Sequence, residues 1–140
     1  MSFVATVPAT NRLLTTVLNV RTRGSVPTTT PDETVAMMIA SGSSAVERYT
    51  ERVFAREEGI QTERIASCAS RILLERVPVT LISVVENGVE LDPTGYDLDA
   101  ERGILTRVVS DAYGNWTGTV TVTYEGGYVL PGDPDDPDGA

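Results

Sequence analysis

The chain has 140 residues, of which 41% are hydrophobic, and its 20 acidic and 11 basic residues give a formal net charge of −9. It contains no histidine, which excludes Ser-His-Asp triads, Cys-His pairs and histidine-ligated zinc sites. All of its basic residues are arginine, and so acidic a chain is poorly suited to bind DNA phosphates. We therefore expect a protein that is not an enzyme, needs no cofactor and does not bind DNA specifically.

Two further features limit the class of protein. No apolar run approaches the ~20 residues of a transmembrane helix, and the N-terminal MSFVATVPAT does not resemble a secretory signal, so no membrane association is expected. The single cysteine, Cys68, excludes an internal disulfide. With no histidine to activate its thiol, we expect Cys68 to be a small buried or half-buried filler.

Two helices are expected in the first part of the chain. Thr10 is positioned to cap a short helix that carries the leucine and valine residues after it. A longer helix is predicted over about 30–54, because in TPDE Thr30 can act as N-cap, Pro31 as the first helical residue and Glu33 as the capping-box partner. Apolar residues recur along it at three- and four-residue steps and form one stripe. The stripe consists of Val35, Met38, Ile39, Gly42, Val46, Tyr49 and Val53.

The middle of this helix, ASGSSA over residues 40–45, is made of small residues. A glycine such as Gly42 costs a helix about 1 kcal/mol relative to alanine. We therefore expect another element to approach closely here, either from the same chain, which is the simpler interpretation, or from a neighbouring subunit. Gly42 and Ser43 are accordingly candidate interface residues.

Strand signals dominate the second half of the chain. RVPVTLISVVENGVEL (residues 76–91) predicts a β-hairpin with a type I′ turn at Asn87-Gly88, and Pro78 is expected at a strand start, an edge or a bulge. The hairpin either completes the domain's own sheet or offers its edge to a partner chain. Because both interpretations stay open, Asn87 and Gly88 are candidate interface residues.

Three other segments are expected to be extended. A short extended segment is predicted near 60–66, and YDLDAERGILTR predicts a second strand pair. GTVTVTYEGGY alternates strongly, which predicts a strand with Val120, Val122 and Tyr124 on one face. The strand exit, with Gly126, Gly127 and Tyr128, is interpreted as a turn or a hinge, and these three residues are also candidate interface residues.

The predicted fold is therefore α+β: a small helical bundle, with its main helix at about 30–54, followed by an antiparallel β-hairpin region at about 70–125. We expect one domain over residues 1–130 and a disordered acidic, proline-rich tail, PGDPDDPDGA, over 131–140. The tail superficially resembles the start of an EF-hand calcium loop, but its acids do not have the required spacing, so no metal site is expected.

Several motifs in one order resemble the head–tail connector (head-completion adaptor) family of long-tailed bacteriophages and prophages. The resemblance extends over roughly residues 30–130 and combines LLERVPVTLISV, NGVEL, GYDLDAERGIL, a tryptophan and VTVTYEGGY. The matching positions are Pro78-Val79, Ile82, Val85, Gly88, Leu91, Tyr96, Asp99, Gly103 to Leu105, Trp116, Val122, Tyr124, Gly127 and Tyr128.

The resemblance implies a structural virion protein. Such proteins form a homo-oligomeric ring, typically a dodecamer, beneath the portal protein in the neck between capsid and tail, after assembly in the host cytoplasm. The ring extends the DNA channel, through which DNA passes without specific binding, and gives a docking platform to a downstream neck or tail protein. Family members usually continue into a C-terminal helix after the GY motif, and no signal for this helix is present in the acidic tail.

Two alternatives stay open. Another neck component, such as a head-closure or tail-terminator protein, would be expected to have a more barrel-like β fold and little helix near its N-terminus. A small carboxylate-based enzyme is the other alternative, because acids cluster at Glu57-Glu58, at Asp97, Asp99 and Glu101, and at Asp133 to Asp138. None of these clusters is accompanied by a recognisable base, nucleophile and orienting group.

Overall fold

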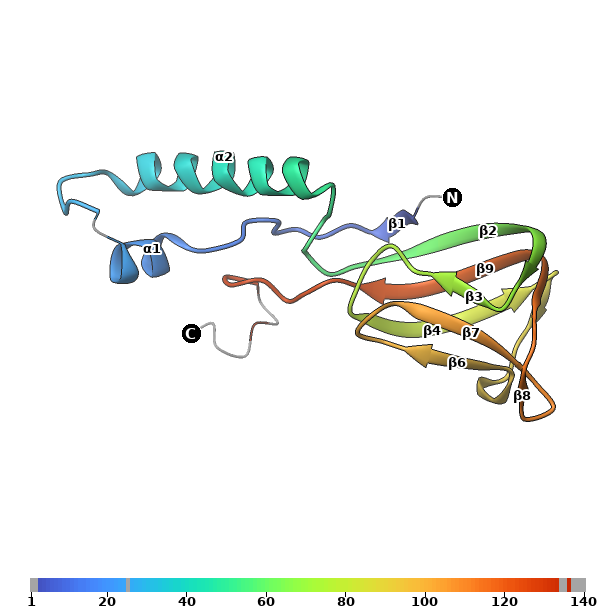
Figure 1. Cartoon of the computed structure of the whole chain (residues 1–140). Coiled ribbons are helices and arrows are strands. Elements are labelled where there is room, and N and C mark those ends of the chain that lie inside the picture. Colours follow the sequence, from blue (N-terminus) through green and yellow to red (C-terminus); the bar gives the residue numbers. More distant parts are fainter. Residues whose placement is uncertain (1–2, 25, 134–135, 137–140) are drawn as a thin grey trace. The chain divides into compact units, whose positions relative to one another are not determined.

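The computed structural model describes residues 3–24, 26–133 and 136, and the chain folds into two compact units (Figure 1). The β unit comprises Met1–Pro8 and Glu57–Gly127, and the helical unit comprises Ala9–Arg56 and Tyr128–Ala140. The chain therefore passes from one unit to the other three times. Much of the predicted tail, residues 134–135 and 137–140, lies outside the described residues, and its disorder stays a prediction.

The described strands of the β unit form two antiparallel sheets. The first sheet has the order β1 (Phe3–Val7), β2 (Glu57–Ala69), β9 (Trp116–Gly126), β4 (Val79–Glu86) and β5 (Val89–Glu90). The second has the order β3 (Arg71–Leu73), β7 (Ile104–Val109) and β6 (Tyr96–Asp99), with β8 (Ala112–Tyr113) paired to β7. A short 3-10 helix, η1 (Pro93–Gly95), precedes β6.

The core of the β unit lies between the two sheets. On β9, Val120, Val122 and Tyr124 are fully buried, which confirms the face predicted from the alternation of this strand. Leu105 on β7 contributes to the same core from the second sheet, and its carbonyl accepts a hydrogen bond of 3.3 Å from the Trp116 indole. The buried core cluster contains Phe3, Ile72, Leu74, Val79, Val84, Leu105, Trp116, Val120, Val122 and Tyr124.

The predicted hairpin is present. Asn87 and Gly88 have φ angles of 51° and 81°, as a type I′ turn requires, and β4 starts directly after Pro78. Strand β4 pairs with β9 on one side and with β5 on the other, so the hairpin completes the sheet of its own chain. The second predicted strand pair is also confirmed, because β6 pairs antiparallel with β7.

The helical unit contains α1 (Val17–Arg23) and α2 (Asp32–Thr50). The predicted start at Thr10 is wrong: α1 is capped by Thr16, whose hydroxyl accepts the Asn19 N–H at 3.2 Å. The predicted bounds 30–54 are also too wide. Pro31 occupies the N-cap position of α2, and Glu51 ends the helix in the left-handed conformation with a φ of 54°.

The predicted helical bundle followed by a hairpin region is contradicted. The structure is 42% strand and 22% helical, with two helices and two antiparallel sheets in its described part. The main reason is β2, a 13-residue strand that the sequence indicated only as a short extended segment near 60–66. Its inward positions Glu57, Gly59 and Gln61 are buried but not apolar, so the alternation that predicts a strand is missing from it.

The two sheets are joined by a partly buried ion pair between Arg107 on β7 and Glu86 on β4. Two guanidinium nitrogens, Nε and Nη2, donate to one Glu86 oxygen at 3.3 and 3.2 Å, and the other oxygen accepts the Thr117 N–H at 3.1 Å. The Arg107 and Glu86 side chains are only 16% and 12% exposed, and the guanidinium carbon lies 5.6 Å from the Trp116 ring centroid. The pair therefore connects the sheets beside the largest core side chain.

Replacement of Arg107 by alanine should destabilise the β unit strongly, because it leaves the partly buried Glu86 carboxylate without its cation. We expect a loss of about 3–5 kcal/mol in the free energy of unfolding, measured by urea denaturation. The matched control is Arg102→Ala, since Arg102 is 79% exposed and lies 3.9 Å from Asp99. That change should cost less than about 0.5 kcal/mol, and equal losses in the two variants would contradict the inter-sheet role.

Candidate interaction surface

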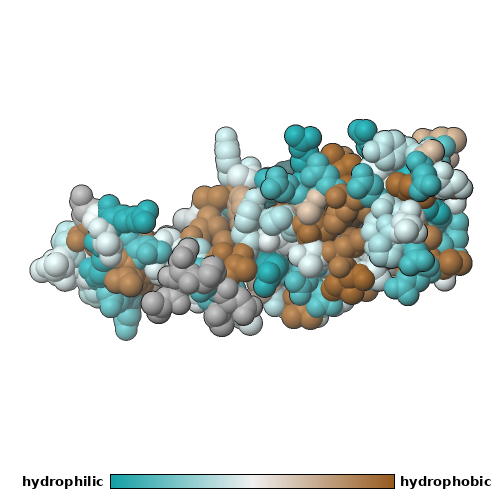
Figure 2. Space-filling view, turned by 90° about the horizontal axis from the view of Figure 1, so that it is seen from below, coloured by the Kyte–Doolittle hydropathy of each residue, from teal (hydrophilic) through white to brown (hydrophobic). Residues whose placement is uncertain are grey.

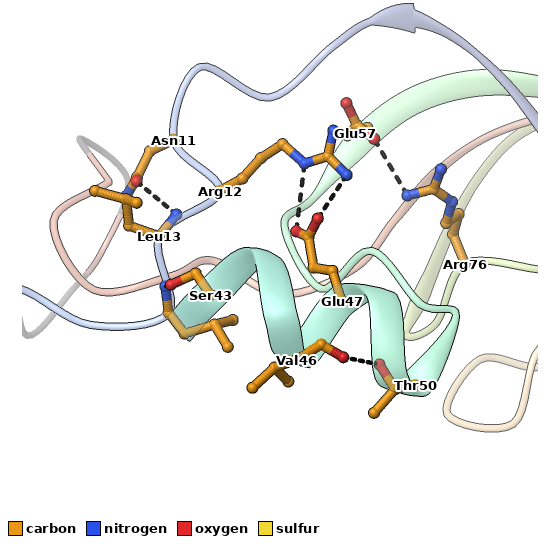
Figure 3. Close-up of polar contacts among 10 residues, drawn as sticks. Asn11, Arg12, Leu13, Ser43, Val46, Glu47, Thr50, Glu57 and Arg76 are labelled. Atoms are coloured by element: carbon orange, nitrogen blue, oxygen red, sulfur yellow. Dashed lines mark hydrogen bonds and ion pairs between the residues drawn. The ribbon is translucent and has the colours of Figure 1, made fainter. Parts of the chain in front are cut away.

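One side of α2 is fixed to the segment that precedes α1. The Arg12 guanidinium donates two hydrogen bonds to the Glu47 carboxylate, at 3.3 and 2.9 Å, and the Ser43 hydroxyl accepts the Leu14 N–H at 3.0 Å. Figure 3 shows Arg12, Ser43 and Glu47 together on this side, whereas Val46 points away from them. Ser43, a predicted interface residue, is buried and already has a partner in its own chain.

The predicted apolar stripe of α2 is divided into two rows. Val35, Ile39 and Ser43 are buried, and they form the row that packs within the helical unit. The adjacent row is exposed: Met38 is 67% exposed and Tyr49 is 91% exposed. We call this second row, Met38, Gly42, Ala45, Val46 and Tyr49, the outer stripe. A large apolar surface is thus left uncovered by the part of the chain that the structure describes.

Gly42 lies at the centre of the outer stripe and is not in a close contact within the chain. A β-carbon built at this position would meet no described heavy atom within 4 Å. The expectation that Gly42 permits intrachain packing is therefore wrong. The alternative, approach by a neighbouring subunit, stays a prediction.

An apolar pocket of about 440 Å³ adjoins the N-terminal end of the outer stripe. It lies among α1, the loop after it and the first half of α2. Its lining residues are Val20, Val26, Pro27, Thr30, Val35, Met38 and Ile39. The sequence analysis did not find this pocket; its only signal is the apolar pair Val26-Pro27 within an otherwise polar loop.

The helical unit has a small core of its own. Among its described residues, four hydrophobic ones are buried, in contrast to the ten of the β unit's core cluster. These four are Val35, Ile39, Ala55 and Leu130. So few buried apolar groups offset little of the conformational entropy that ordering two helices costs, so the unit is incomplete by the standard of a stable domain.

The hairpin tip belongs to the β unit's own sheet. The Asn87 side chain accepts the Thr119 N–H at 3.0 Å and donates to the Thr117 hydroxyl at 3.2 Å. Gly118, with a φ of 65°, lies beneath it, and a β-carbon there would be 1.9 Å from Asn87 Oδ1. Asn87 and Gly88 are exposed, but the polar groups of Asn87 are directed to β9 and not to solvent.

The candidate residues at the end of β9 are mainly structural. Gly126 is buried and lies close to Arg76. A β-carbon added at residue 126 would be 2.3 Å from the Arg76 β-carbon, so no larger residue fits there without a shift. Gly127 is buried too, and with it the chain leaves the β unit. Tyr128 donates its N–H to the Phe54 carbonyl at 2.7 Å, and its side chain is 49% exposed.

A buried polar network lies between β2, β9 and the loop after β3. Gln61, which has no exposed surface, donates to the Leu73 carbonyl at 2.9 Å and accepts both the Glu75 N–H at 3.0 Å and the Tyr124 hydroxyl at 2.7 Å. Burial raises the pKa of Tyr124 from 10.0 to about 12. Because every group in it is paired within the chain, the network stabilises the loop and presents no free group to a substrate.

The acidic side chains, the single cysteine and the apolar character of the helices are further features of the described residues. The carboxylates form no cluster that could hold a metal ion among these residues. Cys68 is exposed, so the expectation of a buried or half-buried filler is wrong. In the described part of the chain, no helix has the length and apolar character needed to cross a membrane. Figure 2 shows one face of the molecule, on which apolar patches alternate with hydrophilic ones.

Comparison with known proteins does not assign the chain to a family. No family model matches the sequence, and no curated protein matches it significantly.

The contact between Asn87 and Gly118 can be tested by a double-mutant cycle. Gly118→Ala should cost more than about 2 kcal/mol of stability, because it adds both backbone strain at positive φ and a clash with the Asn87 amide. In an Asn87→Gly background only the strain is left, and the cost should fall to about 1 kcal/mol. Identical costs in both backgrounds, measured by urea denaturation, would show that the two residues are not coupled.

The buried Tyr124 hydroxyl predicts a loss of stability at alkaline pH. Below pH 10 both the folded and the unfolded chain keep the phenol protonated, so the stabilisation is fully present. Above that pH the unfolded chain loses the proton first, and stability should fall by up to about 1.4 kcal/mol per pH unit until the folded state also ionises. Tyr124→Phe should lose less stability than the unmodified chain between pH 9.5 and 11.5, and parallel losses would contradict the assignment.

Proposed function

We propose that this protein is a structural component of the neck of a tailed bacteriophage or prophage, a head–tail connector that forms a homo-oligomeric ring beneath the portal protein. The observation that carries the proposal is the outer stripe of α2, whose Met38 and Tyr49 are largely exposed beside a helical unit with a small core. Such a unit gains stability when other chains cover it, as in an assembly subunit. The resemblance of the motifs over residues 30–130 supplies the class of assembly.

The charge of the chain supports a role around moving DNA. With a net charge of −9, the protein repels phosphates and gains no counterion release from them, so DNA can slide past it without being held. The proposed ring extends the channel and serves as a docking platform for the next neck or tail protein. Its location is the virion, with the host cytoplasm as the place of assembly.

One observation favours a second candidate, another neck component such as a head-closure or tail-terminator protein. That alternative is expected to have a more β-rich fold, and the structure is 42% strand. The 19-residue helix α2 near the N-terminus favours the connector instead. A carboxylate-based enzyme stays the least favoured alternative, because none of the acid clusters of the sequence is accompanied by a recognisable base, nucleophile and orienting group.

The proposal is tested by quantitative mass spectrometry of purified tailed particles, combined with chemical cross-linking. We expect the protein in mature particles at a copy number close to that of the portal protein, with cross-links to the portal. This result follows if one ring of the chain stacks on the portal ring.

Two outcomes would count against the connector. Presence in the particle with cross-links only to tail or other neck proteins would favour the second candidate. Absence from mature particles, in a preparation that retains the portal protein in full amount, would remove the structural role.

A further inference from the structure

Strand β1 lies at the edge of the first sheet and is anchored by one buried side chain. Phe3 is buried, whereas the four residues that follow it, Val4 to Val7, are exposed. The Phe3 ring centroid lies 5.1 Å from that of Tyr124 and 4.9 Å from the Arg76 guanidinium carbon. The Phe3 N–H also donates to the Glu75 carboxylate at 2.8 Å. The position of β1 therefore depends mainly on how this single residue is received.

The residues that receive Phe3 come from three other segments of the β unit. They are Gly59 on β2, Tyr124 on β9 and Arg76 in the loop after β3, and we call them the β1 slot. The absence of a side chain at Gly59 is essential, because a β-carbon there would lie 2.4 Å from the tip of the Phe3 ring. The slot is thus shaped for an extended segment that carries an aromatic ring at this position.

The β1 slot is held in shape by hydrogen bonds in which β1 takes no part. The Arg76 guanidinium donates to the buried Glu57 at 3.2 Å (Figure 3), and the Arg76 N–H donates to the Tyr124 hydroxyl at 3.3 Å. That hydroxyl donates in turn to Gln61 at 2.7 Å. Because these bonds join the walls of the slot to one another, the slot should keep its shape when β1 leaves it, and it is preorganised for a strand.

The connection between β1 and its slot is long. Residues 8–56 lie between β1 and β2, and they include the segment Ala9–Arg56 that belongs to the helical unit. A tight hairpin holds two strands together, whereas a connection of this length gives β1 an effective concentration at its own slot of about millimolar order. Pro8, which is exposed and has no N–H to donate, ends the strand and separates it from the rest of the chain. An identical strand from another copy therefore competes for the slot.

We propose that β1 is an exchangeable strand: when copies of this chain assemble, residues 3–7 of one copy occupy the β1 slot of a neighbouring copy. Exchange preserves every contact of Phe3, so it costs little beyond the opening of the strand. Each copy gives one strand and receives one, so the exchange links successive copies around a ring and leaves no slot empty. The inference rests on the proposed function for the ring, but exchange between two copies needs no portal protein.

The experiment cross-links two cysteine variants of the full chain, both in a Cys68→Ser background. Val4 and Ile60 are opposite each other in the β1–β2 pairing, so their β-carbons lie about 5 Å apart. Val4→Cys chains with one tag and Ile60→Cys chains with another are incubated together at up to about 1 mM and treated with a short bismaleimide. A mixed product forms when β1 of one copy lies on β2 of another, and its yield should rise with chain concentration.

The matched control replaces Val4→Cys by Val89→Cys. Val89 is 64% exposed, against 63% for Val4, and it lies on β5, the opposite edge strand of the same sheet. The Val4→Cys mixture should give at least about five times as much mixed product as the control mixture. Equal yields at every concentration would overturn the exchange.

Phe3→Ala should act in opposite directions in the two chains. In the Val4→Cys chain it removes the anchor of the donated strand, so the mixed product should fall to the level of the control. In the Ile60→Cys chain it loosens that chain's own strand, so its slot is open to the intact strand of the other copy and the mixed product should rise. Any other pair of results would contradict the exchange.

These outcomes are separable from those that test the proposed function. Exchange in solution, with no protein in mature particles, would overturn the neck role and leave the exchangeable strand intact. Protein in the particles at the copy number of the portal, with no exchange at any concentration, would overturn the exchangeable strand alone.

Discussion

The β unit depends on the inward face of β9. This strand pairs with β2 on one side and with β4 on the other, and it contributes Trp116, Val120, Val122 and Tyr124 to the core. The remaining features of the unit are arranged around it: the Gln61 network meets the Tyr124 hydroxyl, the hairpin turn bonds to Thr119, and the Arg107–Glu86 pair lies beside Trp116. A single alternating strand thus determines where both sheets and both polar networks lie.

The two units differ in how completely each one covers its own apolar side chains and hydrogen-bonds its own buried polar groups. In the β unit, the buried polar side chains are hydrogen-bonded and the core is continuous between the sheets. In the helical unit, the ion pair of Arg12 with Glu47 fixes one side of α2, while Met38 and Tyr49 on the outer stripe are uncovered. The β unit therefore acts as the self-sufficient scaffold, and the helical unit is the part whose stability gains most from another protein chain.

The sequence predicted elements wherever the local pattern and the burial agreed. The alternation of β9 and the Asn-Gly turn of the hairpin were interpreted correctly, because apolar side chains and positive φ angles leave clear signals. Only a short part of β2, near 60–66, was predicted, because Gln61 occupies a buried position in which groups from other segments form its hydrogen bonds. The division of α2 into two rows was not predictable, since Ile39 and Met38 are equally apolar and only tertiary packing decides which is covered.

The helical unit is discontinuous in the sequence. Arg56 and Phe54 bond to the backbone of Tyr128, and the buried Leu130 is one of its few core residues, so this unit is closed by a segment that the ribosome adds more than 70 residues after α2. The central strand β9 is likewise synthesised late. Neither unit can therefore finish folding before residues 116–130 have been synthesised, and α2 lacks its C-terminal partners until then. The glycine, serine and alanine residues of ASGSSA keep the hydrophobicity of α2 low during this interval.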